Sequence, residues 1–90
     1  MVLRRNNVNV SGAGSRAMMF SHGFGCDQNM WTEVARAFEP DFRVILFDHV
    51  GAGRSDLAAY DAERYTKLEG YADDVVDIGR ALGFEDAVFV

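Results

Sequence analysis

The sequence contains one cysteine, two histidines and no long hydrophobic run. Cys26 alone cannot form an internal disulfide, which fits a reducing compartment or a fold that needs no disulfide. Together with His22 and His49 it is too small a set for a structural zinc site, so we expect no metal and no cofactor. Because no apolar stretch reaches transmembrane length or follows the N-terminal arginines, we expect neither a membrane span nor a signal peptide.

Positive charge is scarce in the second part of the chain. The formal net charge is -5; residues 1–55 carry six Arg against five Asp or Glu, whereas residues 56–90 carry three Lys or Arg against nine. An acidic half without a basic stripe argues against nucleic acid and against an anionic membrane surface as partners. With 49% hydrophobic and 26% charged residues over 90 positions, the chain is expected to be one small cytoplasmic domain.

Short apolar runs predict the strands. Val8 and Val10 alternate with polar residues, which indicates a half-exposed strand, and the Ser/Gly segment 11–15 supplies a turn after it. Continuous apolar runs indicate strands that are buried on both faces. Residues 17–20 form such a run, and residues 43–47, apolar after Arg43, and 87–90 are expected to be two further buried strands.

Two segments between these strands have helical periodicity. Asp27 is a suitable N-cap for the first helix, and Pro40 ends it. The apolar face of that helix contains Trp31, Val34, Ala35 and Phe38. Thr66 and Glu69 form a capping box for the second helix, and Gly83 is its C-terminal stop. Its apolar face contains Leu68, Tyr71, Ala72, Val75, Gly79 and Leu82. The resulting β-β-α-β-α-β order predicts an α/β fold, a mainly parallel sheet with helices on both faces.

The segment SHGFGCD, residues 21–27, lies where a buried strand passes into a helix. In parallel sheets this carboxyl edge is where ligands bind. Gly23 and Gly25 would let the backbone bend and approach a ligand, leaving the Phe24 N–H free to stabilise a developing negative charge. A tight turn whose glycines serve geometry only is an equally good interpretation. For His22, a turn histidine bonded to the backbone is favoured over a catalytic base, because the sequence places no partner beside it.

The segment FDHVGAGRSD, residues 47–56, follows the next strand. Gly51 and Gly53 suggest a nucleotide fingerprint, but residue 56 is not glycine and a long polar loop follows, so that pattern fails. We interpret the segment as a shaped turn in which Asp48 and Ser55 accept hydrogen bonds from loop amides. A general-base role for Asp48 is the less favoured alternative.

Other chemically active side chains have structural explanations. Cys26 is expected to be a small packed side chain rather than a nucleophile. Asp73, Asp74 and Asp77 are expected to form the solvated face of the second helix, where the first and last repel each other mildly.

Four segments together resemble the α/β-hydrolase superfamily, and its RsbQ-like branch most of all. That branch contains bacterial stress-response regulators related to the plant karrikin and strigolactone receptors. The segments are HGFGCDQNMW, RVILFDHVGAGRSD, AERYTKLEGYADDV and AVFV. The resemblance implies an oxyanion hole whose donor is the Phe24 N–H. It implies that three residues shape this turn, namely His22, Gly23 and Gly25. It also implies a structural loop made by Asp48, Gly51, Gly53 and Ser55.

In such proteins the strand at 87–90 leads into a G-x-S-x-G nucleophile elbow, and this sequence ends before one. None of its serines takes the place of the nucleophile, and His49 does not take that of the triad base. The resemblance therefore implies the N-terminal part of a serine hydrolase for a small apolar ester or lactone, inactive by itself. Two alternatives remain. One is a regulator that binds a small hydrophobic ligand and a signalling protein such as a stress-response phosphatase. The other is a truncated chain without function.

Overall fold

A single sheet organises the computed structural model, which describes residues 2–84 and 86–90. The described strands are β1 (Asn9–Ser11), β2 (Ala17–Phe20), β3 (Arg43–Leu46) and β4 (Val88–Phe89). Their order across the sheet is β1-β3-β2-β4. β2 pairs in parallel with both β3 and β4, whereas β1 runs antiparallel to β3. The predicted mainly parallel sheet is therefore confirmed.

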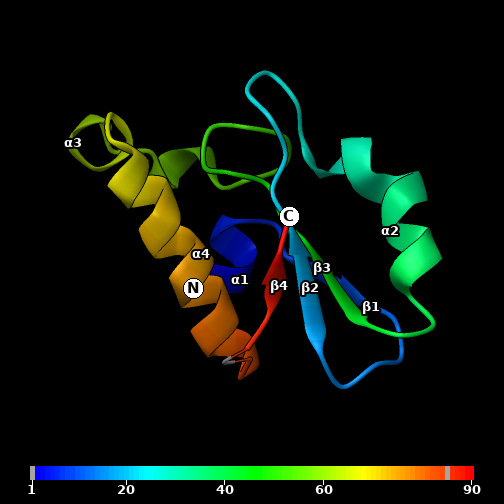
Figure 1. Cartoon of the computed structure of the whole chain (residues 1–90). Helices are drawn as coiled ribbons and strands as arrows, with labels where there is room; N and C mark the ends of the chain where they lie inside the picture. The colour runs from blue at the N-terminus through cyan, green and yellow to red at the C-terminus, as the bar shows by residue number, and fades with distance from the viewer. Residues whose placement is uncertain (1, 85) are drawn as a thin grey trace.

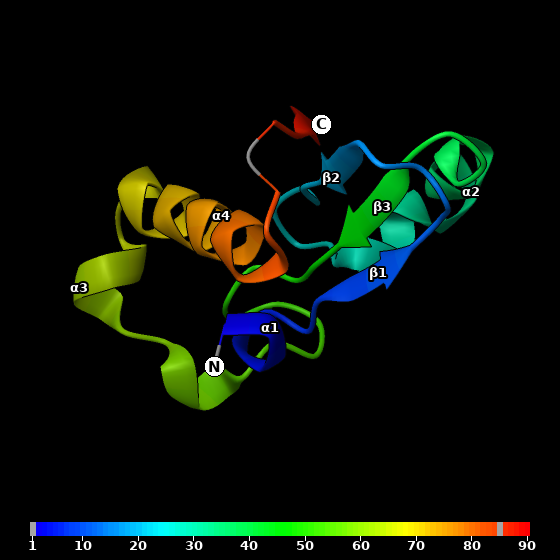
Figure 2. The same cartoon turned by 90° about the horizontal axis from the view of Figure 1, so that it is seen from below.

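Helices cover both faces of the sheet, as predicted (Figures 1 and 2). They are α1 (Val2–Arg5), α2 (Thr32–Phe38), α3 (Ala62–Tyr65) and α4 (Leu68–Leu82), with the 3₁₀ turns η1 (Gln28–Trp31) and η2 (Leu57–Ala59). α4 and α1 lie on one side of the sheet and α2 on the other. The sequence did not predict α1, and the expected long loop contains η2 and α3.

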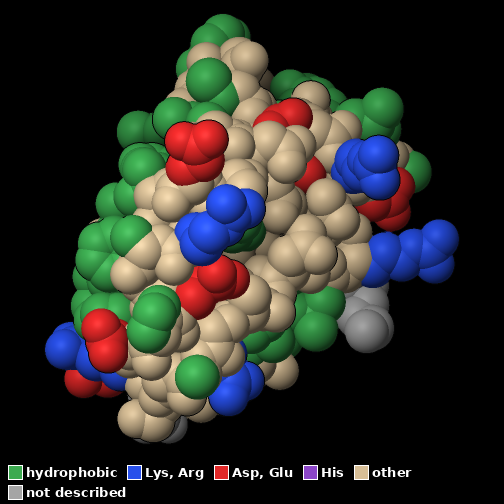
Figure 3. Space-filling model, turned by 90° about the vertical axis from the view of Figure 1, so that its right-hand side faces the viewer, with side chains coloured by type: hydrophobic (Ala, Val, Ile, Leu, Met, Phe, Trp, Pro, Cys, Tyr) green, Lys and Arg blue, Asp and Glu red, His purple; other side chains and the backbone are tan. Residues whose placement is uncertain are grey.

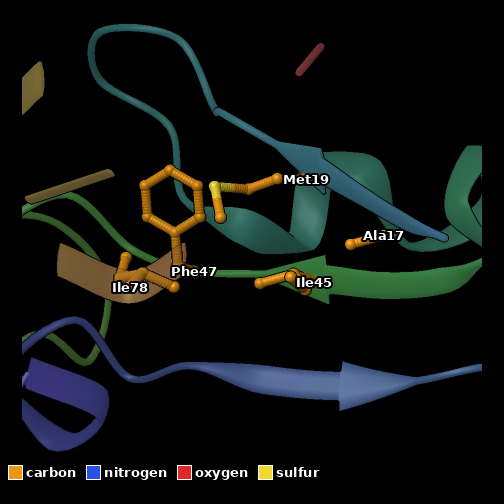
Figure 4. Close-up of a cluster of buried hydrophobic side chains, with 5 residues drawn as sticks. All are labelled: Ala17, Met19, Ile45, Phe47 and Ile78. Carbon is orange, nitrogen blue, oxygen red and sulfur yellow. The ribbon is translucent and has the colours of Figure 1, made fainter. Parts of the chain in front are cut away.

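Successive residues of the central strands point to opposite faces of the sheet, and each face has its own core. All four residues of β2 are buried, as expected for a strand covered on both sides. One core joins β2 and β3 to Ile78 of α4 (Figure 4). Its other members are Ala17, Met19, Ile45 and Phe47. The second core joins the alternate residues of the same strands to α2, through Met18, Phe20, Val44 and Ala35.

The helical segment after β2 begins at the predicted cap. The Asp27 carboxylate accepts a hydrogen bond from the Asn29 N–H at 2.9 Å. The first turn after this cap is the 3₁₀ turn η1, and α2 follows from Thr32. An Asp cap of this kind stabilises a helix by about 1 kcal/mol. It thereby sets where the chain turns back from the carboxyl edge of the sheet.

The capping box predicted at Thr66 is wrong. Lys67 is the N-cap of α4, and its side chain makes no capping hydrogen bond. Thr66 instead closes the end of α3, where its backbone N–H donates to the Ala62 carbonyl at 3.1 Å. The Thr66 backbone is therefore already helical and cannot adopt the extended conformation of an N-cap. At the other end of α4, Gly83 has φ 79° and closes the helix, as predicted.

Asp74 is fully buried, so the expected solvated acidic face is wrong at this residue. Its carboxylate lies 2.8 Å from the Arg5 guanidinium of α1 and 2.5 Å from that of Arg64 in α3. The Tyr65 hydroxyl donates to its second oxygen at 2.8 Å. A buried carboxylate is tolerated only when it is paired and hydrogen-bonded in this way. The two arginines are distant in sequence, so the periodicity of α4 could not reveal them.

The apolar stripe predicted for α4 is turned partly away from the core. Leu68 is 85% exposed, and Tyr71, Ala72 and Val75 line a cavity beside it. The helix contacts the sheet core through Ile78, which is fully buried, and through Val75 and Leu82, which pack beside it. The stripe therefore serves as a wall of the cavity described below.

The end of the described chain leaves apolar side chains exposed. Phe89 of β4 is 56% exposed and Val90 is 45% exposed. Figure 3 looks onto the α2 side of the molecule and shows hydrophobic side chains gathered along the margin nearest β4.

Candidate functional site

Two turns meet at the carboxyl edge of the sheet. Because β2 and β3 are parallel, residues 21–27 and 47–56 leave the sheet at the same edge, next to the end of β4 (Figure 1). α4 adds its apolar stripe from the side. Together these segments line a cavity of about 1300 Å³. Among the described residues, no Lys or Arg lines it and Asp27 is its one carboxylate.

The first turn projects Phe24 into solvent at the mouth of this cavity. The Phe24 side chain is fully exposed and belongs to the cavity lining. The turn is closed by a hydrogen bond of 3.1 Å from the Cys26 N–H to the Gly23 carbonyl. Within the described part of the chain, the Phe24 N–H donates to no acceptor. It is thus a free backbone donor at the edge of the cavity.

The two glycines of this turn differ in their roles. Gly25 has φ 78°, which a side chain would make costly. Gly23 has no positive φ, and a side chain placed on it would meet nothing within 4 Å. The predicted sharp bend therefore belongs to Gly25, while Gly23 leaves open space beside the Phe24 N–H.

His22 links the first turn to the second. One ring nitrogen, Nδ1, lies 2.9 Å from the Gly23 carbonyl, and the other, Nε2, accepts the His49 N–H at 3.0 Å. A carbonyl can only accept, so Nδ1 carries the proton and Nε2 the lone pair. Both nitrogens are therefore occupied by backbone groups. This is the backbone-bonded turn histidine favoured from the sequence, and it leaves no free nitrogen for proton transfer.

Asp48 joins three segments of the chain and is 1% exposed. Its carboxylate accepts the Gln28 N–H at 2.9 Å, the Arg54 N–H at 3.0 Å and the Asn7 side-chain amide at 3.0 Å. Burial acts to raise the pKa of Asp48, but these hydrogen bonds outweigh it and the pKa is lowered. Asp48 therefore holds the loops as a carboxylate. Its carboxylate accepts hydrogen bonds from loop amides, which is the role favoured from the sequence.

Ser55 closes the second turn. Its hydroxyl accepts the Gly51 N–H at 3.0 Å, as predicted. Gly51 and Gly53 have positive φ values of 97° and 52°. A side-chain carbon on Gly53 would lie 2.5 Å from an oxygen of Asp48. Gly53 therefore lets the loop pass close to the Asp48 carboxylate, and Gly51 provides a positive φ in the same turn.

The structure brings together a pair that the sequence did not suggest. The Ser21 hydroxyl lies 2.8 Å from Nε2 of His49, and both residues line the cavity. Burial lowers the pKa of His49, as does the neighbouring His22, while the charges of Asp74 and Asp48 act in the opposite direction. Ser21 and His49 are 28 positions apart. Only the parallel pairing of β2 and β3 places them side by side.

Cys26 is exposed, so the expectation of a packed side chain is wrong. It follows Gly25 at the mouth of the cavity, where no core exists to cover it. Over residues 2–84 and 86–90, no cluster of His, Cys, Asp or Glu has a geometry that holds a metal ion. In the same residues, no helix has the length and apolar character needed to span a bilayer.

A mainly parallel sheet with helices on both faces defines an α/β fold, and in such folds ligands bind at the carboxyl edge of the sheet. The particular family follows from comparison with known proteins. The alpha/beta hydrolase fold family matches residues 16–90, which is most of the chain. The chain therefore belongs to the α/β-hydrolase-fold family.

Among similar proteins are two from plants. The chain is 40% identical over 78 residues to karrikin insensitive 2 receptor CA of Petunia hybrida, covering 87% of this chain and 29% of that protein. It is 38% identical over 89 residues to strigolactone esterase D14 of Arabidopsis thaliana, covering 99% of this chain and 33% of that protein. The plant receptor group named in the sequence resemblance is thus among its relatives.

A solved structure is also similar. The structure of olei00960, a hydrolase from Oleispira antarctica, superposes with a TM-score of 0.93 at 46% identity, covering 98% of this chain and 32% of that chain. The chain thus spans about a third of the length of the relatives it matches.

Proposed function

We propose that this chain forms the oxyanion-binding part of a serine-type α/β hydrolase that acts on a small, apolar, uncharged ester or lactone. The observation that carries the proposal is the free Phe24 N–H at the mouth of the cavity. The cavity lining supports an uncharged substrate, because no Lys or Arg of the described chain is available there to pair with an anionic one.

The role of the Phe24 N–H follows from the chemistry of ester cleavage. When a nucleophile attacks an ester, the carbonyl oxygen gains negative charge, and a backbone N–H aimed at it stabilises the transition state. A backbone donor costs no reorganisation if the turn already holds it in place, as the closed turn around Gly25 does. One such donor changes kcat by about 100- to 1000-fold.

The nucleophilic serine, the triad acid and the triad histidine would come from residues outside these 90. The relatives, each about three times as long as this chain, support this division. The isolated chain should accordingly show no repeated, saturable turnover of p-nitrophenyl acetate. Such turnover by the isolated chain would contradict the proposal.

A chimera tests the role of Phe24 directly. This chain replaces the matching third of the Oleispira antarctica hydrolase, with which it shares 46% identity. Phe24→Pro removes the N–H, whereas Phe24→Ala keeps it and removes only the ring. We expect Phe24→Pro to lower kcat for p-nitrophenyl acetate by about 100-fold or more, and Phe24→Ala to change it by only a few-fold.

Thermal unfolding of the variants provides the control for the chimera. If both variants stay folded and lose the same activity, the ring and not the N–H is responsible, and the proposed role is wrong. If Phe24→Pro retains full activity, the donor lies elsewhere.

A second candidate function is a ligand-sensing regulator. It is favoured by one observation, that similar proteins include a karrikin receptor. In this case the cavity would hold a small hydrophobic signal, and the complete protein would bind a signalling partner such as a stress-response phosphatase. Ester turnover by the complete protein separates the two functions, since a regulator binds a lactone without turning it over at a useful rate.

A further inference from the structure

The Ser21 hydroxyl and the His49 imidazole have the geometry of a nucleophile and its general base. Their separation of 2.8 Å lies in the range in which an imidazole can remove the hydroxyl proton. This pair lies at the start of the first turn and is separate from the Phe24 N–H. It needs no residue outside the described chain.

The imidazole of His49 is held by packing. Its ring lies edge-to-face against Phe47, Tyr71 and His22, with centroid distances of 5.0, 5.5 and 4.7 Å. Its backbone N–H is bound to His22. Its Nδ1 is buried and has no hydrogen-bond partner among the described residues. Within residues 2–84 and 86–90 no carboxylate is hydrogen-bonded to the ring, so this base is weaker than that of a triad.

The backbone of Ser21 is fixed, while its hydroxyl faces the cavity lining. Its N–H donates to the Val90 carbonyl at 2.8 Å, and its own carbonyl accepts the Trp31 indole N–H at 3.0 Å. These bonds anchor the residue between β4 and η1. Burial lowers the pKa of His49 and so favours the neutral imidazole. In the tautomer that carries its proton on Nδ1, Nε2 has the lone pair that faces the Ser21 hydroxyl.

We propose that Ser21 and His49 form an acyl-accepting dyad, which takes the acyl group of a small activated ester entering the cavity. The Ser21 oxygen forms a bond to the acyl carbon while its proton passes to Nε2 of His49. The bond from that carbon to the leaving oxygen then breaks, and the leaving alcohol takes the proton from His49. The products are an ester on Ser21 and a free alcohol, so atoms and charge balance.

This dyad is expected to react once per chain. Without an orienting acid, the removal of the acyl group by water is slow, so one equivalent of alcohol is released. The proposal is therefore compatible with the expectation that the isolated chain shows no repeated turnover. The dyad does not depend on the role of the Phe24 N–H as oxyanion donor, which is tested separately in the chimera.

Site-specific labelling of the 90-residue chain tests the dyad. The chain is treated with a fluorophosphonate, which bonds to the serine oxygen with loss of fluoride, and each serine-containing peptide is quantified by mass spectrometry. Ser11 and Ser15 are exposed, whereas Ser21 is half-buried, so accessibility alone would favour the first two. We expect Ser21 to be labelled at least about 100-fold faster.

The variants Ser21→Ala and His49→Gln complete the test. Glutamine can still hydrogen-bond to the serine but cannot take its proton, so His49→Gln should lower Ser21 labelling by about 100-fold. Unfolding the chain in urea should make all serines equally slow. The burst of p-nitrophenol from p-nitrophenyl acetate, about one equivalent, should vanish in Ser21→Ala. Equal labelling of Ser11, Ser15 and Ser21 in the folded chain, or undiminished labelling of Ser21 in His49→Gln, overturns the proposal.

Discussion

Replacing Asp48 by alanine tests whether its carboxylate holds the loops of the site together. The carboxylate accepts two backbone N–H groups and one side-chain amide, each within 3.0 Å, and is almost fully buried. A hydrogen bond to a charged group contributes about 1.5–3 kcal/mol, and a buried donor left alone costs about 1–3 kcal/mol. Because some of these donors will form hydrogen bonds with water instead, we expect Asp48→Ala to lower the free energy of unfolding by about 3–5 kcal/mol. A 90-residue chain has about 5–13 kcal/mol of stability in total.

Urea unfolding, followed by Trp31 fluorescence and far-UV circular dichroism, measures this loss. With a slope of about 1–3 kcal/mol per molar urea, the midpoint should fall by more than 1 M. Asp56→Ala is the matched control, because Asp56 is exposed and accepts one bond, from the Ala58 N–H. It should cost about 1 kcal/mol or less. If the two variants shift the urea midpoint equally, the Asp48 carboxylate does not hold the loops together and the reasoning is refuted.

The pH dependence of the same variant provides a second check. The pKa of Asp48 is lowered in the folded chain, so the carboxylate contributes stability above its unfolded pKa, about 3.9. That contribution is lost as the pH falls through the lower, folded value. The stability difference between the wild type and Asp48→Ala should therefore be constant near neutrality and shrink below about pH 4.

Two further predictions concern α4 and His49. Gly70→Ala should destabilise the chain by about 2–3 kcal/mol in urea unfolding, because its new carbon would lie 2.0 Å from the Arg64 carbonyl oxygen; the control Gly79→Ala, whose nearest contact is 3.5 Å, should be neutral or stabilising. Burial and the neighbouring His22 lower the pKa of His49 in the folded chain, although the charges of Asp74 and Asp48 act to raise it. Below about pH 6.5, the unfolded chain therefore binds a proton on His49 more readily than the folded chain does. Stability should thus fall between pH 7.5 and 5.5, and His49→Gln should reduce that slope; an unchanged slope contradicts the argument.

The fold was predictable where a local pattern decides the structure. The apolar run at 17–20 had to be covered on both faces, and it is the central strand β2. Asp27 and Gly83 act at helix ends through their own backbone or side chain, so their roles are visible in sequence. The capping box at Thr66 failed because α3, a short helix with no clear sequence pattern, already contains the chain up to Tyr65.

The site was predictable in part for the same reason. Asp48 and Ser55 bond largely to amides near them in the chain or in the adjacent turn, as short polar side chains in loops do. Asp74 was misjudged, because its partner Arg5 comes from α1 at the other end of the chain. The pairing of Ser21 with His49 went unnoticed because no motif links residues 28 positions apart.

The amino-acid sequence by itself determined the alternation of buried strands and helices, the turns that carry Gly25 and Gly53, and membership of the α/β-hydrolase-fold family. These features depend on short-range periodicity and on backbone angles that few residues adopt. Only the tertiary structure decided which groups meet across the carboxyl edge of the sheet. The reason is physical: parallel pairing of β2 and β3 brings two distant turns within hydrogen-bonding distance, and the balance between burial and hydrogen bonding then determines which side chains there stay charged.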